Sequence, residues 1–463
     1  SGTRSNPGSG SAGTFPSMRF CLVSLGCPKN EVISDNLAQL LVEAGHRVVS
    51  HPTEADLLLV NTCGFIAPAR EESLEVLREL AAGKRAGQKL VAVGCLAQLA
   101  GRDMLAWVPE LDGLLGTRRW VEVGEFLERL GEAGPEGHPV MIDDGRPAAR
   151  VGVQQHILRG CPSASAYLSI AEGCNAACAF CTIPRIKGPL QSRPVSAVVR
   201  EARFLVEQGA KELVIVAQDT TAYGQDRGER HGLPNLLREI LRAVPEVPWL
   251  RLMYAYPQHI TPDLVEVMAE DPRICHYLDI PLQHAHPEVL RRMHRPYDVA
   301  RMESVLESLR LAMPDITLRT SLIVGYPGAS EAEFSALLDF VQRAAFDKVG
   351  VFTYSREPGT AAHDLDGQVL EAVKEERYHR LMALQQRISL ARNREQVGRT
   401  LEVLVEGAAD GISVGRSYRD APEIDGLVIF EGEAPAGEFV SVRITGAAEY
   451  DLTGVWVRRR LRG

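Results

Sequence analysis

The sequence lacks the features of a membrane protein or a secreted protein. No apolar run in its 463 residues reaches the roughly 18 residues that a membrane-spanning helix needs. No basic segment followed by an apolar one precedes Met18, and residues 1–17 are rich in Gly, Ser and Pro. We therefore interpret 1–17 as a leader outside the fold and expect a cytoplasmic protein with no membrane contact.

The sequence also lacks an excess of positive charge. It contains 51 Lys and Arg residues against 60 Asp and Glu residues, which gives a net charge of −9. Proteins that bind a nucleic-acid backbone rely on clustered Lys and Arg side chains. The charge balance therefore disfavours nucleic-acid binding as the main role and fits a basic protein partner better.

A disulfide framework is the third missing feature. The nine cysteines are an odd number, they are widely spaced, and no secretory signal accompanies them. Metal ligation is therefore the first hypothesis for the cysteines.

Alternating apolar runs and helical patterns indicate an α/β fold in the first third of the chain. Within 18–145 the strand-like runs MRFCLVSLG, DLLLVNT and KLVAVG alternate with helical segments. This alternation predicts an N-terminal domain with a doubly wound parallel sheet. Turn residues in GPEGHP and DDGRP place a linker within the looser stretch 135–163, and we assign it to 146–163.

Six further strand candidates follow in 164–396, and each but the last precedes a helical pattern. The six runs are AYLSIAE, KELVIVA, WLRLMYA, HYLDIP, ITLRTSLIVG and KVGVFTYS. This repeat predicts a central, partial (β/α)6 barrel, with a long helix over 367–396 packing back on it. Short β-type runs between Gly-rich turns in 397–463 predict a small antiparallel β-barrel.

The strongest chemical signal is the CxxxCxxC motif of Cys174, Cys178 and Cys181, which directly follows the first strand of the central domain. Three thiolates within eight residues can hold one soft metal centre and leave its fourth position open for substrate. A three-cysteine zinc site completed by a distant histidine is the alternative. Because such barrels carry active sites at the carboxyl ends of their strands, we favour a catalytic centre.

A second constellation comprises Cys27, Cys63 and Cys95, each of which lies immediately after one of the three N-terminal strands. The carboxyl ends of parallel strands line one crevice, so these residues can converge in space. We therefore predict a second three-cysteine metal site, against the alternative that each is a buried apolar side chain.

Several other residues have less informative surroundings. Cys21, Cys161 and Cys275 are interpreted as structural thiols. His284 and His286 form an HxH motif, but no carboxylate or thiolate motif accompanies it, so we do not assign metal ligation there.

The CxxxCxxC motif, with the aromatic Phe180 before the third cysteine, resembles the signature of the radical S-adenosylmethionine (SAM) superfamily. The resemblance implies a 4Fe–4S cluster on Cys174, Cys178 and Cys181, whose open iron binds SAM. It also implies cleavage of SAM to a 5′-deoxyadenosyl radical, with Phe180 beside the adenine.

The order of the domains, together with IPRIKGPLQSRP, DIPLQHAHPEVLRRMHRP and IVGYPG, resembles the methylthiotransferases over 18–463. This resemblance implies a TRAM domain at the C-terminus and a second, auxiliary 4Fe–4S cluster on the N-terminal cysteines that handles sulfur. One SAM is then the methyl donor and another the radical source. Gln218, Asp219 and Gln283 follow strands and are candidates for SAM or substrate contacts, unless they only cap strands and order loops.

Two branches of the family differ in substrate: one modifies an adenosine in tRNA and the other an aspartate of ribosomal protein S12. LGCPKN, AQDTTAYG and GRSYRDAPEIDG are similar to the ribosomal-protein branch, so we expect methylthio transfer to the aspartate β-carbon. One departure is Glu31–Asp35, where an acidic residue and a serine are expected directly after LGCPKN. The resemblance implies S12 as partner and an electron donor such as flavodoxin or ferredoxin, with nucleic acid met at most through the ribosome.

The charge of 397–463 provides an independent argument for a protein substrate. This segment has eleven acidic residues, eight arginines and no lysine, although four of the arginines lie in the terminal RRRLR. We expect acidic surface residues such as Asp420, Glu423 and Asp425 to dock a basic ribosomal protein. A zinc-stabilised, non-catalytic RNA-binding protein is the alternative from another class, and the terminal β-barrel is its main support.

Overall fold

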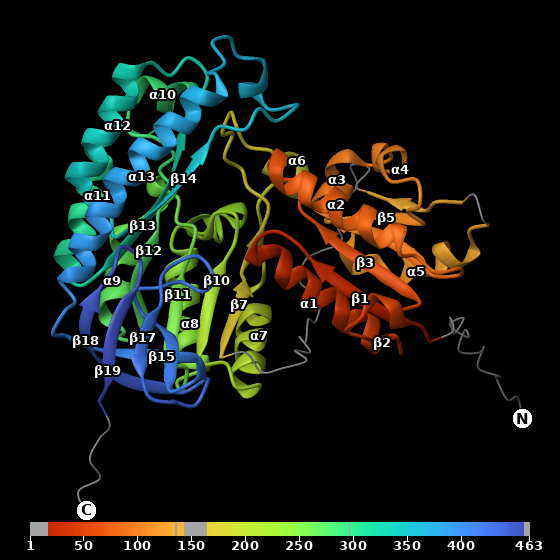
Figure 1. Cartoon of the computed structure of the whole chain (residues 1–463), viewed down its shortest axis with the longest axis horizontal. Coiled ribbons are helices and arrows are strands. Elements are labelled where there is room, and N and C mark those ends of the chain that lie inside the picture. Colours follow the sequence, from red (N-terminus) through yellow and green to blue (C-terminus); the bar gives the residue numbers. More distant parts are fainter. Residues whose placement is uncertain (1–16, 135–136, 143–163, 296, 458–463) are drawn as a thin grey trace, which may run out of the picture. The chain divides into compact units, whose positions relative to one another are not determined.

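The computed structural model describes residues 17–134, 137–142, 164–295 and 297–457. The chain separates into two compact units, one of 1–64 and 68–149 and the other of 65–67 and 150–463. Both units are built on parallel sheets with helices, as the sequence predicted (Figure 1). Residues 1–16 of the predicted leader 1–17, the predicted linker 146–163 with Cys161, and the terminal RRRLR lie outside the described residues. No helix of the described part has the length and apolar character needed to cross a membrane.

The first unit contains a parallel sheet of six strands in the order β2-β1-β3-β4-β5-β6. The three predicted strands are β1 (Arg19–Ser24), β3 (Leu57–Thr62) and β4 (Lys89–Gly94), and Phe20 of β1 lies opposite Leu57 of β3. Three short strands were not predicted from the sequence, and the last of them lies in the stretch expected to be irregular. They are β2 (Arg47–Val48), β5 (Gly113–Gly116) and β6 (Val140–Met141). Two to four residues are too few for an alternating pattern to stand out.

Helices cover both faces of this sheet, which makes it doubly wound. They are α1 (Pro28–Glu43), α2 (Ala67–Ala82), α3 (Cys95–Ala100), α4 (Asp103–Trp107) and α5 (Val123–Glu132). Ile33, Leu37 and Leu41 recur every four residues, so α1 buries one apolar face, together with α5, against one side of the sheet. Helices α2, α3 and α4 form a second core on the other side.

The second unit contains a parallel sheet whose six strands follow chain order, β7-β10-β11-β12-β13-β14. The strands are β7 (Ser165–Ser169), β10 (Glu212–Val216), β11 (Trp249–Leu252), β12 (Ile274–Asp279), β13 (Thr317–Val324) and β14 (Lys348–Thr353). A short antiparallel pair, β8 (Ala171–Glu172) and β9 (Gln191–Ser192), follows β7. The six-stranded sheet is open at β7 and β14, as a partial barrel requires.

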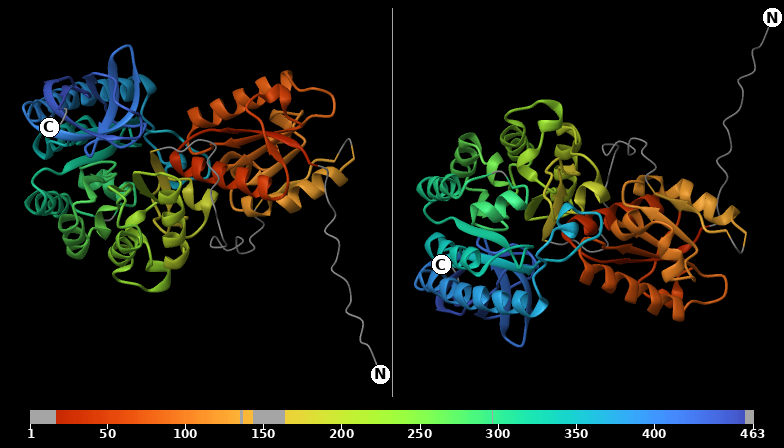
Figure 2. Two further views of the ribbon diagram at one scale, coloured as in Figure 1. Left: turned by 90° about the horizontal axis from the view of Figure 1, so that it is seen from below. Right: turned by 90° about the horizontal axis from the view of Figure 1, so that it is seen from above.

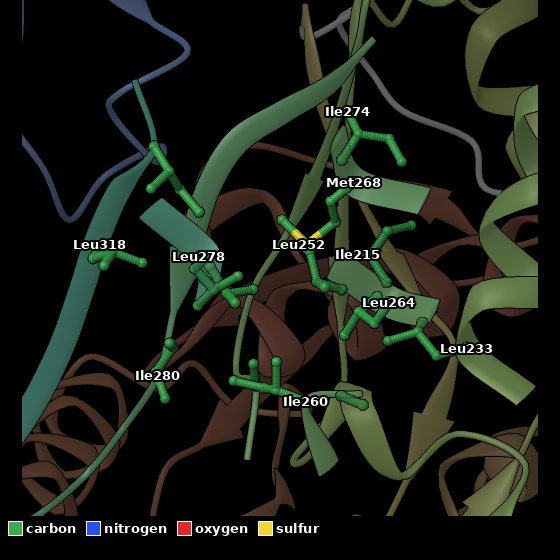
Figure 3. Packing of buried hydrophobic residues seen from close by; sticks show 14 of the residues in the cluster. Ile215, Leu233, Leu252, Ile260, Leu264, Met268, Ile274, Leu278, Ile280 and Leu318 are labelled. Atoms are coloured by element: carbon green, nitrogen blue, oxygen red, sulfur yellow. The ribbon is translucent and has the colours of Figure 1, made fainter. Parts of the chain in front are cut away.

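Helices pack against this open sheet and bury one continuous core. They are α7 (Val195–Glu207), α8 (Gly232–Ala243), α9 (Pro262–Glu270), α10 (Pro287–Arg292), α11 (Val299–Ala312), α12 (Glu331–Ala344) and α13 (Glu371–Arg394). The short helix α6 (Ile183–Lys187) precedes β9. Figure 3 shows Ile215 and Leu252 of the sheet beside Leu233 of α8 and Leu264 of α9. This core fixes the strands, so the loops at their carboxyl ends are held in place.

The long helix α13 packs on the barrel, as predicted, and buries both apolar and charged side chains. Leu381, Leu384 and Ile388 join the core. Leu370 precedes the helix with 75% of its surface exposed. At the amino end the buried positions are held by charged side chains instead: Lys374 donates to the Tyr354 carbonyl oxygen at 2.9 Å. A long side chain can bury its methylene groups and still satisfy its charge on a carbonyl, which a search for apolar residues misses.

Residues Thr400–Trp456 form a closed five-stranded barrel, which we call the terminal barrel. Its strands are β15 (Thr400–Ala409), β16 (Ile412–Ser417), β17 (Val428–Glu431), β18 (Phe439–Ala447) and β19 (Leu452–Trp456), in the order β15-β16-β17-β19-β18. All pairs are antiparallel except β17 with β19, which run parallel. Both views in Figure 2 show this barrel, in dark blue, within the second unit.

The terminal barrel joins the central domain through buried ion pairs. Arg416 and Arg251 both contact Glu212, at 2.7 and 2.6 Å, and none of the three side chains is more than 1% exposed. Burial opposes ionisation of Glu212, but the two guanidinium groups outweigh it and lower the pKa of this carboxyl to about 2. Glu212 begins β10, so this contact lies at the amino ends of the barrel strands. The carboxyl ends of these strands, at the opposite edge of the sheet, are therefore not covered by this contact.

The segment that connects β16 with β17 supplies two of the acidic groups expected on the surface, and that expectation is wrong for both. Asp420 is 4% exposed and pairs with Lys348 at 2.8 Å. Asp425 accepts a hydrogen bond from the Tyr277 hydroxyl at 2.6 Å, and its side chain is 3% exposed. Only Glu423 of the three is exposed. The acidic excess of this segment therefore serves in large part to neutralise cations of the central domain.

Candidate functional site

The CxxxCxxC motif forms a loop, residues 174–181, which we call the cysteine loop, at the carboxyl end of β7 and β8. Its entry is fixed by Gly173, whose φ is +76° and where a Cβ would overlap the Pro189 carbonyl oxygen. The Cys174 amide donates to Gly188 O at 3.1 Å, and the Cys181 amide donates to Cys178 O at the same distance. The loop thus turns back on itself and carries its three thiols on one short segment.

The thiols of this loop are partly covered. Burial raises the pKa of Cys181 to about 12 and also raises the pKa of Cys174, with a smaller rise from the neighbouring Cys178 in both cases. In the metal-free protein these two thiols are therefore protonated at neutral pH, and a bound metal must displace their protons.

No three Cys, His, Asp or Glu side chains of the described ranges already form a set of metal ligands. The loop carries three soft donors on one short segment. Because they do not yet form a ligand set, their side chains have to rotate to bring the three sulfurs to one centre. Thiolates are the ligands that iron–sulfur clusters take in proteins, so the donor set fits such a cluster.

Phe180, the aromatic residue of the motif, packs at the edge of an apolar cluster. The members of the cluster are Ala179, Val289, Met293, Tyr326, Ala329, Tyr354 and Ala362. These side chains come from the cysteine loop, α10 and the loops after β13 and β14. Together they form an apolar surface next to the cysteine loop, which limits the access of water.

The three polar residues predicted at strand ends differ in how they are bonded. Asp219 accepts hydrogen bonds from Thr221 at 2.6 Å and from the Ala222 amide at 3.1 Å, and it lies 2.9 Å from His259. Asp219 thus orders its own loop. Gln218, by contrast, has a buried side-chain oxygen without a hydrogen-bond partner in the described part of the chain.

Gln283 adopts a φ of +71°, which is uncommon outside glycine, and forms an isolated bridge with Leu322 of β13. Such backbone conformations cost free energy and are enriched at functional sites. Gln218 can therefore accept a hydrogen bond from a ligand, and Gln283 has a backbone conformation that is enriched at functional sites. The carboxylate of Asp219, by contrast, already accepts hydrogen bonds from its own loop.

The HxH motif has a structural role in this arrangement. His284 is 3% exposed, and its Nδ1 accepts a hydrogen bond from the His286 amide at 3.0 Å. Burial lowers the pKa of His284 to about 3, so the ring stays neutral. His286 caps α10 by accepting from the Glu288 amide at 3.3 Å.

One residue near the cysteine loop was missed by the sequence analysis. Arg295 has its Nη1 3.5 Å from Cys178 Sγ and is 5% exposed. The only signal in the sequence was its place in LRRMHRP, a segment that carries the family resemblance but indicates no role for this arginine.

The N-terminal cysteines lie at three neighbouring strand ends of the first unit. Cys27 precedes α1 after β1, Cys63 follows β3, and Cys95 begins α3 after β4. The strand order β2-β1-β3-β4 changes direction between β1 and β3, and ligands of such sheets bind at this switch point.

Asn30 ties the three loops together. Its Nδ2 donates to Leu25 O at 2.8 Å and to Thr62 O at 3.1 Å, while Cys95 Sγ lies 3.5 Å from its Oδ1. A Cβ on Gly26 would lie 2.9 Å from Cys63 Sγ, so only glycine allows this approach. The structure thus brings the three cysteine-bearing loops to one place, and their soft donors fit a second cluster.

Comparison with known families matches each part of the chain in turn. Residues 19–116 match the Uncharacterized protein family UPF0004, residues 168–341 the Radical SAM superfamily, and residues 397–457 the TRAM domain. The solved structure of the radical SAM methyltransferase TsrM from Kitasatospora setae shares the fold, with a TM-score of 0.57. It is 15% identical and covers 86% of this chain and 80% of its own.

Similar curated proteins extend over nearly the whole chain. The ribosomal protein uS12 methylthiotransferase RimO of Roseiflexus sp. (strain RS-1) is 49% identical, over 95% of this chain and 97% of the relative. The protein of the same name from Chloroflexus aurantiacus is 50% identical, over 94% and 99%. Since identity at this level spans all three parts, the chain belongs to the RimO family of radical SAM methylthiotransferases.

Proposed function

We propose that this chain attaches a methylthio group to the β-carbon of an aspartate in ribosomal protein uS12. The observation that carries the proposal is identity of 47–50% over nearly the full length with proteins named for that activity. The LGCPKN, AQDTTAYG and GRSYRDAPEIDG motifs support the same branch of the family.

We assign the two clusters to the two cysteine constellations. Cys174, Cys178 and Cys181 hold the 4Fe–4S cluster at which SAM binds, and Cys27, Cys63 and Cys95 hold the auxiliary 4Fe–4S cluster. When bound, these clusters and SAM would supply the sulfur, the methyl group and the radical that removes a hydrogen from an unactivated C–H bond. The convergence of the loops around Asn30 and the short cysteine loop support this assignment.

The remaining residues of the site bind, orient and exclude water. Gln218 and Gln283 contact SAM, and Phe180 lies beside its adenine, whereas Asp219 acts indirectly by ordering the loop after β10. The apolar cluster under Phe180 excludes water, which protects a reactive radical from competing hydrogen donors. No acid or base is required for the C–H step, since an aliphatic carbon offers no acidic proton.

The functional division of the chain and its partners follow from this assignment. The domains extend over 18–145, 164–396 and 397–463, with a linker at 146–163. A low-potential electron donor such as flavodoxin or ferredoxin reduces the first cluster, and nucleic acid is met only where the substrate protein is part of the ribosome.

The test is anaerobic incubation with SAM, reductant, a peptide from the target loop of uS12 and tRNA in one vessel, followed by mass spectrometry. We expect the mass of one methylthio group on the peptide aspartate. A matched peptide with asparagine in place of that aspartate shows whether the reaction depends on the carboxylate. Modification of the tRNA with an unchanged peptide would transfer the activity to the other branch of the family.

Docking of the basic substrate is tested separately, because Asp420 and Asp425 are buried. Glu402, Glu423 and Glu431 are exposed acidic residues of the terminal barrel. Replacing all three by glutamine should raise the KM for uS12 and weaken its dependence on salt, since exposed charges are screened over about 8 Å at physiological ionic strength. Glu71→Gln, an exposed change in the first unit, is the control. An unchanged KM would exclude docking of the substrate through these three carboxylates.

A further inference from the structure

Three consecutive residues after α10 contact three consecutive residues of the cysteine loop. The Ala179 amide donates to Met293 O at 3.0 Å. The ring of His294 lies 3.3 Å from Ala177 O, and Arg295 Nη1 lies 3.5 Å from Cys178 Sγ. We call residues 293–295 the strap. The strap holds the loop at the centre of the CxxxCxxC motif.

The end of α10 fixes the position of the strap. The His294 amide donates to Arg291 O at 3.1 Å and the Arg295 amide donates to Leu290 O at 2.9 Å, the two bonds of a Schellman motif. The left-handed position of that motif usually holds glycine, but here His294 occupies it with a φ of +55°. A non-glycine residue there costs roughly 1–2 kcal/mol. The helix end therefore directs Arg295 to the cysteine loop even at a cost in backbone strain.

Arg295 is a buried cation without a carboxylate partner among the described residues. Its guanidinium lies 4.3 Å from the centre of the Tyr256 ring, Nη2 donates to Pro281 O, and Nη1 faces Cys178 Sγ. Other buried arginines of this unit each face a carboxylate, as Arg251 faces Glu212 and Arg419 faces Asp347. A buried charge without compensation is costly, so the surroundings of Arg295 favour an anion beside Cys178.

We propose that Arg295 is a positioning residue whose guanidinium compensates the negative charge of the cluster on Cys174, Cys178 and Cys181 and raises its reduction potential. This inference rests on the proposed function. Cluster potentials depend on net charge and on hydrogen bonds to the sulfurs. The reaction concerned is the addition of one electron, delivered by the low-potential donor, and it breaks no bond in the protein. A nearby cation favours the more negative, reduced state.

The experiment uses the full chain with Cys27, Cys63 and Cys95 replaced by alanine, so that a single cluster is titrated. In this background we compare Arg295→Gln and Arg295→Lys. The control is Arg310→Gln, because Arg310 also donates to backbone carbonyls, those of Ala344 and Ala345, but lies on α11. Iron per chain, the midpoint potential from an electron-paramagnetic-resonance titration, and SAM affinity are measured for each protein.

We expect the glutamine variant to be reduced at least tenfold less favourably, a downward shift of about 59 mV or more for one electron. The lysine variant should fall between glutamine and the parent, and Arg310→Gln should match the parent. A glutamine variant with full iron and an unchanged midpoint would refute the role, even if its SAM affinity dropped, since Arg295 would then serve the cofactor alone.

Two further outcomes also decide the question. If the glutamine variant loses its iron, restoration by lysine supports charge compensation, and failure of lysine to restore it refutes the proposal. If the background with Arg295 intact gives no cluster signal, the assignment of the first cluster to Cys174, Cys178 and Cys181 fails instead. The two failures are thereby distinguished.

Discussion

The two cysteine constellations each contain three thiols but bring them together in opposite ways. Cys174, Cys178 and Cys181 lie within eight residues of one loop, whereas Cys27, Cys63 and Cys95 are 36 and 32 positions apart and meet only because β1, β3 and β4 are neighbours. The local set depends on one loop and its strap. The distributed set depends on the folding of a whole sheet, so its integrity reports on the tertiary structure of the first unit.

The largest expected effect comes from the local set. Replacing Cys174, Cys178 and Cys181 by alanine should abolish reductive cleavage of SAM and leave about half of the iron, because two similar clusters bind similar amounts. Iron analysis and detection of 5′-deoxyadenosine measure the two effects. Survival of SAM cleavage, or loss of all iron, contradicts the assignment.

Replacing the distributed set should separate the two halves of the reaction. With alanine at positions 27, 63 and 95, we expect SAM cleavage to continue and the methylthio product to disappear, because these thiols belong to the other unit. Products are followed by mass spectrometry on the uS12 peptide. Methylthio transfer at the normal rate would show that sulfur is held elsewhere.

A single glycine can test whether the distributed set depends on close packing of its loops. Gly26→Ala adds a Cβ 2.9 Å from Cys63 Sγ, whereas Gly45→Ala adds one with no atom within 4 Å at a similar φ of +91°. Both changes strain the backbone by roughly 1–2 kcal/mol, but only the first displaces a thiol. We expect Gly26→Ala to lose the auxiliary iron and Gly45→Ala to keep it. Equal iron in both variants would argue against convergence.

The smallest expected effect concerns two asparagines, one hydrogen-bonded in the loops of each cysteine set. Asn30 is 2% exposed and donates to two carbonyls, so Asn30→Ala should lower the free energy of unfolding by about 1–3 kcal/mol. Asn175 is exposed and accepts one bond, from the Leu190 amide, so Asn175→Ala should cost about 1 kcal/mol or less. Thermal or urea unfolding measures both. A reversed order would mean that the local loop, rather than the distributed one, depends on its polar contacts.

The sequence predicted the parts of the fold whose patterns are long and apolar. The parallel sheets, the partial barrel and the strand-end placement of Cys27, Cys63 and Cys95 all follow from runs such as DLLLVNT and KELVIVA. It missed β2, β5 and β6, which have two to four residues each, and β16, whose GRS was interpreted only as part of a motif.

Long-range electrostatics could not be predicted from the sequence. Asp420 and Asp425 lie in an acidic segment whose composition is typical of a solvated surface. Only the structure shows that they are buried, in contact with Lys348 and Tyr277. The same holds for Arg295, since its distance to Cys178 depends on the direction in which α10 ends. Counting charges along the chain therefore gives the sign of the net charge of a region, but it does not show which residues contact a partner.

The ion pairs of the terminal barrel have a consequence for protein engineering. Glu212, Lys348 and Asp347 belong to the central domain, and their partners Arg416, Asp420 and Arg419 belong to the terminal barrel. A chimera that exchanges only residues 397–463 for another barrel would leave buried charges without partners, at about 3–5 kcal/mol for each broken pair. The exchangeable module is thus discontinuous in sequence: a working graft has to carry positions 212, 347 and 348 along with the barrel.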